Sequence, residues 1–287
     1  MAKSQQLMIY PPTFGAMRSP LLPLLLLSFP FGVFAQGEGL PIGARPAGMG
    51  NAAVTLTDLW SVHHNQAGLA GLKSTTVGAF YQRHFLSEEL SHQGIAAAIK
   101  LGKGTLAISG NLFGFDLYRE TKAGLAYAMN FGEGLRAGIQ LDYLNIRLGG
   151  DYGSKSAVAA EIGVQARLVE KLWIGAHVYN PNRAKIGGPY EERVPTIIRA
   201  GLGWLPSDKL TINCEVVKDI DKPEGIRAGL EWHPSKVLFL RTGISTAPVQ
   251  GHFGLGLRFG KLDADLAVAF RSQLGATPQI GLLYRFE

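Results

Sequence analysis

The sequence predicts an all-β protein, a 14-stranded antiparallel transmembrane β-barrel with an N-terminal plug segment. Between Ser74 and Phe286, segments of roughly ten residues alternate apolar with polar or small residues, the length and period of tilted strands that cross a bilayer. The 37 glycines and only 17% charged residues are typical of a strand-rich membrane protein. After the leader, no apolar run reaches the roughly 20 residues of a spanning helix, and only a closed barrel leaves no unpaired edge in lipid.

The alternation divides this part of the chain into fourteen segments, an even number that suits a bacterial single-chain barrel. The expected strands are 74–83, 91–101, 104–113, 119–130, 134–147, 155–168, 171–180, 193–205, 209–218, 223–232, 236–244, 250–259, 262–271 and 277–286.

The chain before the first strand divides in two. Residues 1–35 are expected to be a secretory signal peptide, with an apolar core from Leu21 to Phe34 and cleavage after Ala35. Met17, directly before Arg18, fits the start of such a signal better than Met1 does. Residues 36–73 are rich in Gly, Ala, Asn and Pro and lack the alternation, so we expect a plug or hatch that precedes the barrel of residues 74–287.

Charge and cysteine content exclude several classes of function. Removal of Lys3 and Arg18 with the signal lowers the formal charge from +6 to +4, and the remaining cations are spread over the strands. This distribution argues against nucleic acid as a partner. Cys214 is the one cysteine, which excludes an internal disulfide and a multi-cysteine metal site.

The connections between the expected strands are of two kinds. Short turns occur around Gly102, Glu133, Glu170, Ser207, Pro234 and Gly260, whereas 85–90, 149–153 and 181–192 are longer. Outer-membrane barrels have short periplasmic turns and longer outer loops, so both termini are expected on the periplasmic side. The stretch 180–192 is the best candidate for an external contact.

The phase of the alternation predicts which side chains face the lumen. The first four strands present small residues such as Ala96, Ala98 and Ala107, which leave room for a plug. The remaining strands present a mixed-charge set with amides such as Gln140, Gln165 and Asn213. This set is either a network of neutralising ion pairs or a surplus of arginines that contacts an anionic group. The predicted charged network is Arg136, Asp142, Glu161, Arg167, Arg199, Glu215, Arg227, Glu231, Arg241, Arg258, Asp263, Asp265, Arg271 and Arg285.

The sequence offers no convincing catalytic or metal site. Ser109 lies in a strand without the strained elbow of a nucleophilic serine. His63 and His64 are adjacent rather than spaced to share one face, and the other histidines are scattered over different strands. We therefore predict a protein that is not an enzyme and has no cofactor and no metal.

The plug segment resembles the N-terminal hatch of FadL-type outer-membrane barrels, most of all the PorV/PorQ branch of Bacteroidota. The similarity covers about thirty residues, and two positions depart from the usual hatch: Asp58 stands where an acidic pair is usual, and Gln66 replaces a proline. The residues that carry the resemblance are Gly43, Ala44, Arg45, Gly48, Met49, Gly50, Asp58, Asn65 and Ala67.

The resemblance implies an integral protein of the bacterial outer membrane and divides over function. PorV-like members act in type IX secretion, with cargo or translocon proteins as partners. FadL-like members pass long-chain fatty acids or other hydrophobic solutes through the barrel and out sideways past the hatch. The short loops and ionic lumen favour a PorV/PorQ-like accessory or partner-binding barrel, with hydrophobic transport as the alternative and a general porin third. The expected partners are outer-membrane lipid, secretion or cargo proteins, and a hydrophobic or anionic small molecule.

Overall fold

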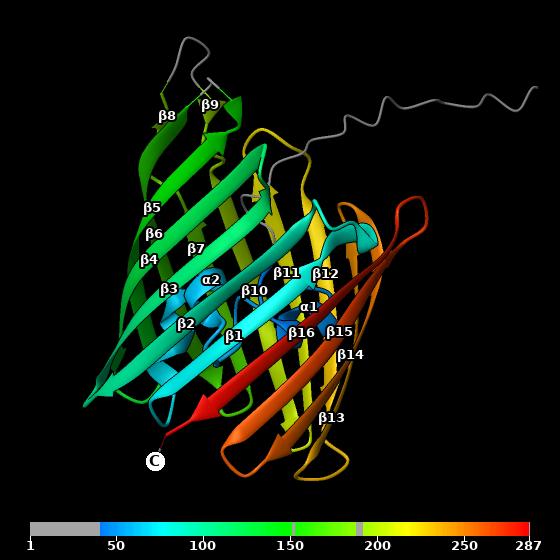
Figure 1. Ribbon diagram of the computed structural model, residues 1–287. Coiled ribbons are helices and arrows are strands. Elements are labelled where there is room, and N and C mark those ends of the chain that lie inside the picture. The colour runs from blue at the N-terminus through cyan, green and yellow to red at the C-terminus, as the bar shows by residue number, and fades with distance from the viewer. Residues whose placement is uncertain (1–40, 151–152, 188–191, 287) are drawn as a thin grey trace, which may run out of the picture. The chain divides into compact units, whose positions relative to one another are not determined.

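Fourteen antiparallel strands close into a barrel in the computed structural model, which describes residues 41–150, 153–187 and 192–286 (Figure 1). The predicted fold class is thereby confirmed. The predicted signal peptide lies outside the described residues. The barrel strands are β1 (Thr76–Arg83), β2 (Ser91–Leu101), β3 (Gly104–Phe115), β4 (Tyr118–Phe131), β5 (Leu135–Leu148), β6 (Ser154–Val169), β7 (Leu172–Tyr179), β10 (Ile197–Ser207), β11 (Leu210–Asp219), β12 (Gly225–Trp232), β13 (Leu238–Thr246), β14 (Val249–Phe259), β15 (Leu262–Arg271) and β16 (Gly275–Arg285).

Each barrel strand pairs with the next one along the chain, and β1 pairs with β16 to close the ring. Every predicted strand has an observed counterpart; several begin one or two residues later than expected, and one begins four residues later. The strand expected from residue 193 begins at Ile197, after a buried stretch containing Pro195, which has no N–H to donate to a ladder. The predicted long loop holds a separate hairpin of β8 (Lys185–Ile186) and β9 (Glu192–Arg193).

The two ends of the barrel differ in their connections. At one end, here called the turn end, the connections are 102–103, 132–134, 170–171, 208–209, 233–237 and 260–261, and β16 finishes there. At the opposite end, the loop end, lie 84–90, 149–153 and 180–196. The predicted asymmetry is only partial, because the loop-end connections after β3 and β13 have just two residues each, 116–117 and 247–248.

The wall is apolar outside, and its inner face carries the polar side chains. On β15, Leu266 is 51% exposed while its neighbour Asp265 is 4% exposed, as the two-residue alternation predicts. Trp204, Trp232 and Tyr284 are exposed near the turn end, where aromatic rings suit a membrane interface. Among the described residues, no helix is long and apolar enough to span a membrane.

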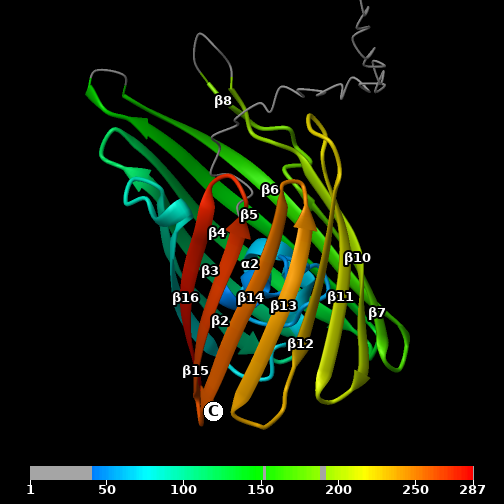
Figure 2. The same cartoon turned by 90° about the vertical axis from the view of Figure 1, so that its right-hand side faces the viewer.

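Residues 41–73 lie inside the barrel and are called the lumen segment (Figures 1 and 2). The segment contains α1 (Ala44–Gly48), α2 (Ser61–His64) and the 3-10 helix η1 (Gln66–Gly71). Trp60, Leu59 and Leu69 are fully buried and pack in one apolar cluster with wall alanines of β2, β3 and β4. Small wall residues therefore make room for the bulky side chains of the segment. The wall alanines of this cluster are Ala96, Ala98, Ala107, Ala126 and Ala128.

Wall glycines let the backbone of the lumen segment touch the barrel. A Cβ added at Gly229 would overlap the carbonyl of Met49, and one at Gly243 would overlap the amide nitrogen of Gly50. Gly163 stands in the same relation to the side chain of Asn65. The absence of a side chain at these positions is required by the close approach of the segment rather than by backbone conformation.

We predict that Gly229→Val displaces the first half of the lumen segment without opening the barrel. Overpacking of this kind costs about 1–3 kcal/mol, and the segment is freer to move than a wall strand. Hydrogen exchange of the amides of residues 44–56 should accelerate, while those of β11 and β12 stay protected. Gly251→Val is the matched control, because a Cβ there meets nothing within 4 Å. Equal exchange in the two variants would contradict the close-approach role.

Candidate functional site in the barrel lumen

Arg45 fastens the first helix of the lumen segment to the barrel. Its guanidinium donates to both carboxylate oxygens of Glu231, at 2.9 Å from Nε and 2.7 Å from Nη2, and to Asp58 at 3.0 Å. Glu231 also accepts from Arg241, which in turn pairs with Asp265. Bidentate pairs of this kind fix geometry as well as charge. Asp58 stands alone where the hatch usually has an acidic pair. It accepts the hydrogen bond from the third guanidinium nitrogen of Arg45, Nη1.

Barrel side chains satisfy the irregular backbone in the middle of the segment. The carboxylate of Glu215 accepts from the amides of Ala53 and Val54, both at 2.8 Å, and from Arg227 at 3.3 Å. Asn213 donates to the carbonyl of Ala52 at 2.9 Å. Gln165 of β6 likewise donates to two segment carbonyls. Residues 51–56 form no regular structure, so these polar strand residues replace the hydrogen bonds that a helix or sheet would provide.

Asn65 and Gln66 hold the third part of the segment. The Asn65 side chain donates to the carbonyls of Val54 at 2.7 Å and Val164 at 3.0 Å, and its oxygen accepts from the amide of Ala67. Gln66 donates to Glu161 at 2.6 Å. The departure from the usual hatch proline therefore adds a polar anchor that a proline side chain could not supply.

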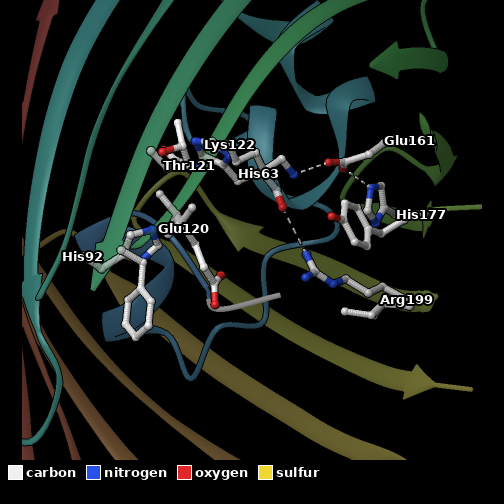
Figure 3. Close-up of a pocket in the computed structure, with 13 residues that line it drawn as sticks. His63, His92, Glu120, Thr121, Lys122, Glu161, His177 and Arg199 are labelled. Carbon is white, nitrogen blue, oxygen red and sulfur yellow. Dashed lines mark hydrogen bonds and ion pairs between the residues drawn. The ribbon is translucent and has the colours of Figure 1, made fainter. Parts of the chain in front are cut away.

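Two lumen residues that the sequence analysis did not select are central to this region. Lys122 of β4 pairs with Glu161 at 2.6 Å and with Asp142 at 3.2 Å, and His177 of β7 contacts Glu161 at 2.8 Å (Figure 3). Lys122 falls on a strand that was expected to be lined by small residues. The sequence did carry a signal for Lys122: it lies two residues before Gly124, and the two-residue alternation therefore places its side chain in the lumen.

The other predicted lumen charges lie outside the clusters around Glu231, Glu215 and Glu161. Arg258 and Arg285 both pair with Asp263, at 2.9 and 2.8 Å, near the turn end. The Arg136 guanidinium lies 4.2 Å from the ring centre of Trp173. Arg271 ends β15 at the loop end, in register with Gly275.

Arg167 lies next to the 170–171 turn, at the turn-end rim of the lumen rather than among the buried charges. Its exposed side chain lies 3.5 Å from Glu133 at the turn end. Arg167 still pairs in regular register with Trp173, and the register shift in the β6–β7 ladder follows it, before Val169.

The remaining motif residues shape the path of the segment. Gly43 has φ 100° and lies against the Trp60 ring, and Gly50 has φ 65° at the turn after α1. Gly48 lies against the backbone of Gly254. Ala44 lies 3.5 Å from the Cβ position of Gly281, and the carbonyl of Met49 meets Gly229. These glycines are needed because left-handed backbone and close approach exclude a side chain.

The lumen segment separates two cavities. The loop-end cavity, of about 620 Å³ including its open mouth, has His63 and Ile42 of the segment in its lining (Figure 3). The turn-end cavity, of about 690 Å³ by the same measure, has Arg45, Asp58 and Leu72 in its lining. Burial, together with Lys122 for His63 and Arg199 for His64, lowers the pKa of both histidines well below the usual value, so both are neutral near pH 7.

Comparisons with known proteins agree on the fold. No family model and no curated protein matches the chain. The structure of the CymD monoaromatic hydrocarbon channel superposes with a TM-score of 0.66 at 11% identity, over 86% of this chain and 98% of that one. The toluene transporter TbuX of Ralstonia pickettii gives 0.63 at 11% identity, over 86% and 98%. A FadL homologue of Pseudomonas aeruginosa gives 0.56 at 9% identity, over 85% and 98%.

The chain therefore has the fold of FadL-type barrels, the broader of the two relationships that the hatch residues suggested. These neighbours are channels and transporters rather than enzymes. The comparisons give no support to the narrower PorV/PorQ relationship.

We predict that Glu215→Ala loosens the lumen segment. The change leaves Arg227 and two segment amides without their carboxylate, a loss of about 3–5 kcal/mol for a buried ion pair. Chymotrypsin should then cleave after Trp60, which is fully buried in the native protein, and mass spectrometry would identify the fragments. Glu170→Ala, at an exposed turn, is the control and should change stability by no more than about 0.5 kcal/mol. Cleavage at the wild-type rate in Glu215→Ala would show that this carboxylate does not anchor the segment.

Proposed function

We propose that the protein is an outer-membrane transporter of small hydrophobic solutes and that the lumen segment is its plug. The observation that carries the proposal is the position of the segment, which lies between two cavities inside a barrel with the FadL-type fold. Proteins with the same fold are named as channels for monoaromatic hydrocarbons and as toluene transporters. The predicted signal peptide and the apolar outer wall favour the bacterial outer membrane, with outer-membrane lipid around the barrel.

In this proposal the loop end faces outside and the turn end faces the periplasm, because short turns are typical of the periplasmic side. A solute enters the loop-end cavity, passes the plug and leaves through the turn-end cavity. The C-terminus, which follows β16 at the turn end, is then periplasmic.

The route past the plug runs along the barrel axis. A sideways exit, which the resemblance implies for FadL-like proteins, needs a gap in the wall. The ladders of β1 with β2 and of β2 with β3 continue without a register shift beside the lumen segment. Opening this wall would break backbone hydrogen bonds that have no replacement in lipid, whereas moving the plug breaks contacts that polar lumen groups or water can replace.

We predict that a tether between plug and wall stops transport. In a Cys214→Ser background, Ala44→Cys and Gly281→Cys place two Cβ atoms about 3.5 Å apart, at the short end of the disulfide range. The oxidised protein should show at least a tenfold lower rate of toluene entry into proteoliposomes, and reduction should restore the rate. The singly substituted Ala44→Cys protein is the control.

A second candidate is the PorV/PorQ-like accessory role in type IX secretion, with cargo or translocon proteins as partners. The continuous wall and the many ionic anchors of the plug favour it, since a rigid closed barrel suits a scaffold. The tethering experiment separates the two candidates. An accessory barrel would show no toluene entry above that of empty liposomes, in either the oxidised or the reduced state, and that result would contradict transport.

A further inference from the structure

Arg199 lies in the lining of the loop-end cavity and differs from the lumen cations that anchor the segment through a carboxylate. It belongs to β10, is 4% exposed, and points toward the cavity (Figure 3). Its Nη1 atom is 3.4 Å from the carbonyls of His63 and His64 and 3.4 Å from Nδ1 of His64. Its Nε atom is buried and has no hydrogen-bond partner in the described part of the chain.

Four other cations of the lumen that hold the plug are matched to carboxylates. Arg45 and Arg241 share Glu231, Arg227 pairs with Glu215, and Lys122 pairs with Glu161. Across residues 41–150, 153–187 and 192–286, Arg199 has no carboxylate within ion-pair distance. A buried ion without a counter-charge is costly, and three long contacts from a single nitrogen compensate little of that cost.

Glu120 and Glu161 both line the cavity, and each already accepts from another side chain; Glu120 accepts from the hydroxyl of Tyr118 at 2.5 Å. Glu161 accepts from Lys122 and Gln66 at 2.6 Å each and contacts His177 at 2.8 Å. Its lone pairs are therefore directed at other donors, and the Arg199 fork stays available for an acceptor that comes from outside the chain.

The rest of the cavity is amphipathic. Both ring nitrogens of His63, Nδ1 of His92 and the side-chain oxygen of Asn111 are buried and have no hydrogen-bond partner among the residues that the structure places. Beside them lie the apolar side chains of Phe113 and Ile197. The site thus combines Arg199, the Lys122–Glu161 pair, Glu120, a few polar groups and an aromatic wall, a mixture of polar and apolar groups that is usual in a small-molecule pocket.

We propose that the loop-end cavity binds a small organic carboxylate, with the carboxylate on the Arg199 guanidinium and the apolar body against Phe113 and Ile197. A guanidinium fork matches a carboxylate in a bidentate manner. The plug closes the cavity on the side of the turn end. A ligand whose apolar part is about one ring therefore fits better than one with a long acyl chain. The inference rests on the proposed transport function and adds to it a class of substrate that is charged at one end.

The test uses 4-fluorobenzoate as the probe and the full chain in a non-ionic detergent, with binding followed by fluorine NMR. Wild-type protein should bind 4-fluorobenzoate at least tenfold more tightly than its neutral analogue 4-fluorobenzamide. Arg199→Gln should lose this preference. Arg136→Gln is the matched control, because Arg136 is a lumen arginine that lies outside the loop-end cavity and stacks on Trp173; it should bind as the wild type does.

Arg199→Lys separates a loss of binding from a loss of folding, because it keeps the positive charge beside the plug and removes the planar guanidinium. It should retain a heat-modifiable barrel and bind the probe more weakly than wild type. The inference would be overturned if the wild type bound 4-fluorobenzoate and 4-fluorobenzamide equally well, or if Arg199→Gln bound 4-fluorobenzoate as tightly as the wild type does. If toluene enters but 4-fluorobenzoate does not bind, the inference about the site is overturned and the proposed transport function stands. If 4-fluorobenzoate binds but neither toluene nor 4-fluorobenzoate enters, the binding site is supported and the proposed transport function is overturned.

Discussion

The constraint on which the rest of the structure depends is the neutralisation of charge inside a closed barrel. Glu215, Glu231 and Glu161 point inward from strands whose outer faces are apolar. A carboxylate buried in this way needs donors, and the lumen segment supplies them through Arg45, the amides of Ala53 and Val54, and Gln66. The segment in turn lacks regular structure over residues 51–56 and depends on the wall for its hydrogen bonds.

This mutual dependence explains the division of the wall into two parts. Where the segment presents Trp60, Leu59 and Leu69, the wall presents alanine, and the contact is apolar. Where the segment presents backbone, the wall presents glycine beside acids, amides and arginine, and the contact is polar. Charge and space are therefore matched strand by strand. Arg199, which has no carboxylate partner among the described residues, faces a cavity as well as the segment.

Much of the architecture could be predicted from the sequence because a strand has a period of two and a bilayer has a defined thickness. That phase was sufficient to place Glu215, Glu231 and Arg199 inside. The phase gives the face of a strand but not the depth of a residue along it, so it did not show that Arg167, beside the 170–171 turn, is exposed. Lys122 and His177 were missed for another reason: their importance comes from Glu161 on a different strand, and such cross-barrel contacts have no signature in local sequence. The two cavities are likewise properties of the assembled lumen.

In the proposed function, the ion pairs and close backbone contacts of the lumen segment keep the resting barrel closed, in contrast to a general porin. The most direct test is the electrical conductance of single wild-type barrels in a planar bilayer at neutral pH. A plugged barrel should show almost no steady current, with openings that become frequent only when urea loosens the lumen segment. A large and steady current from the untreated protein would show that residues 41–73 do not close the lumen and would contradict the central claim.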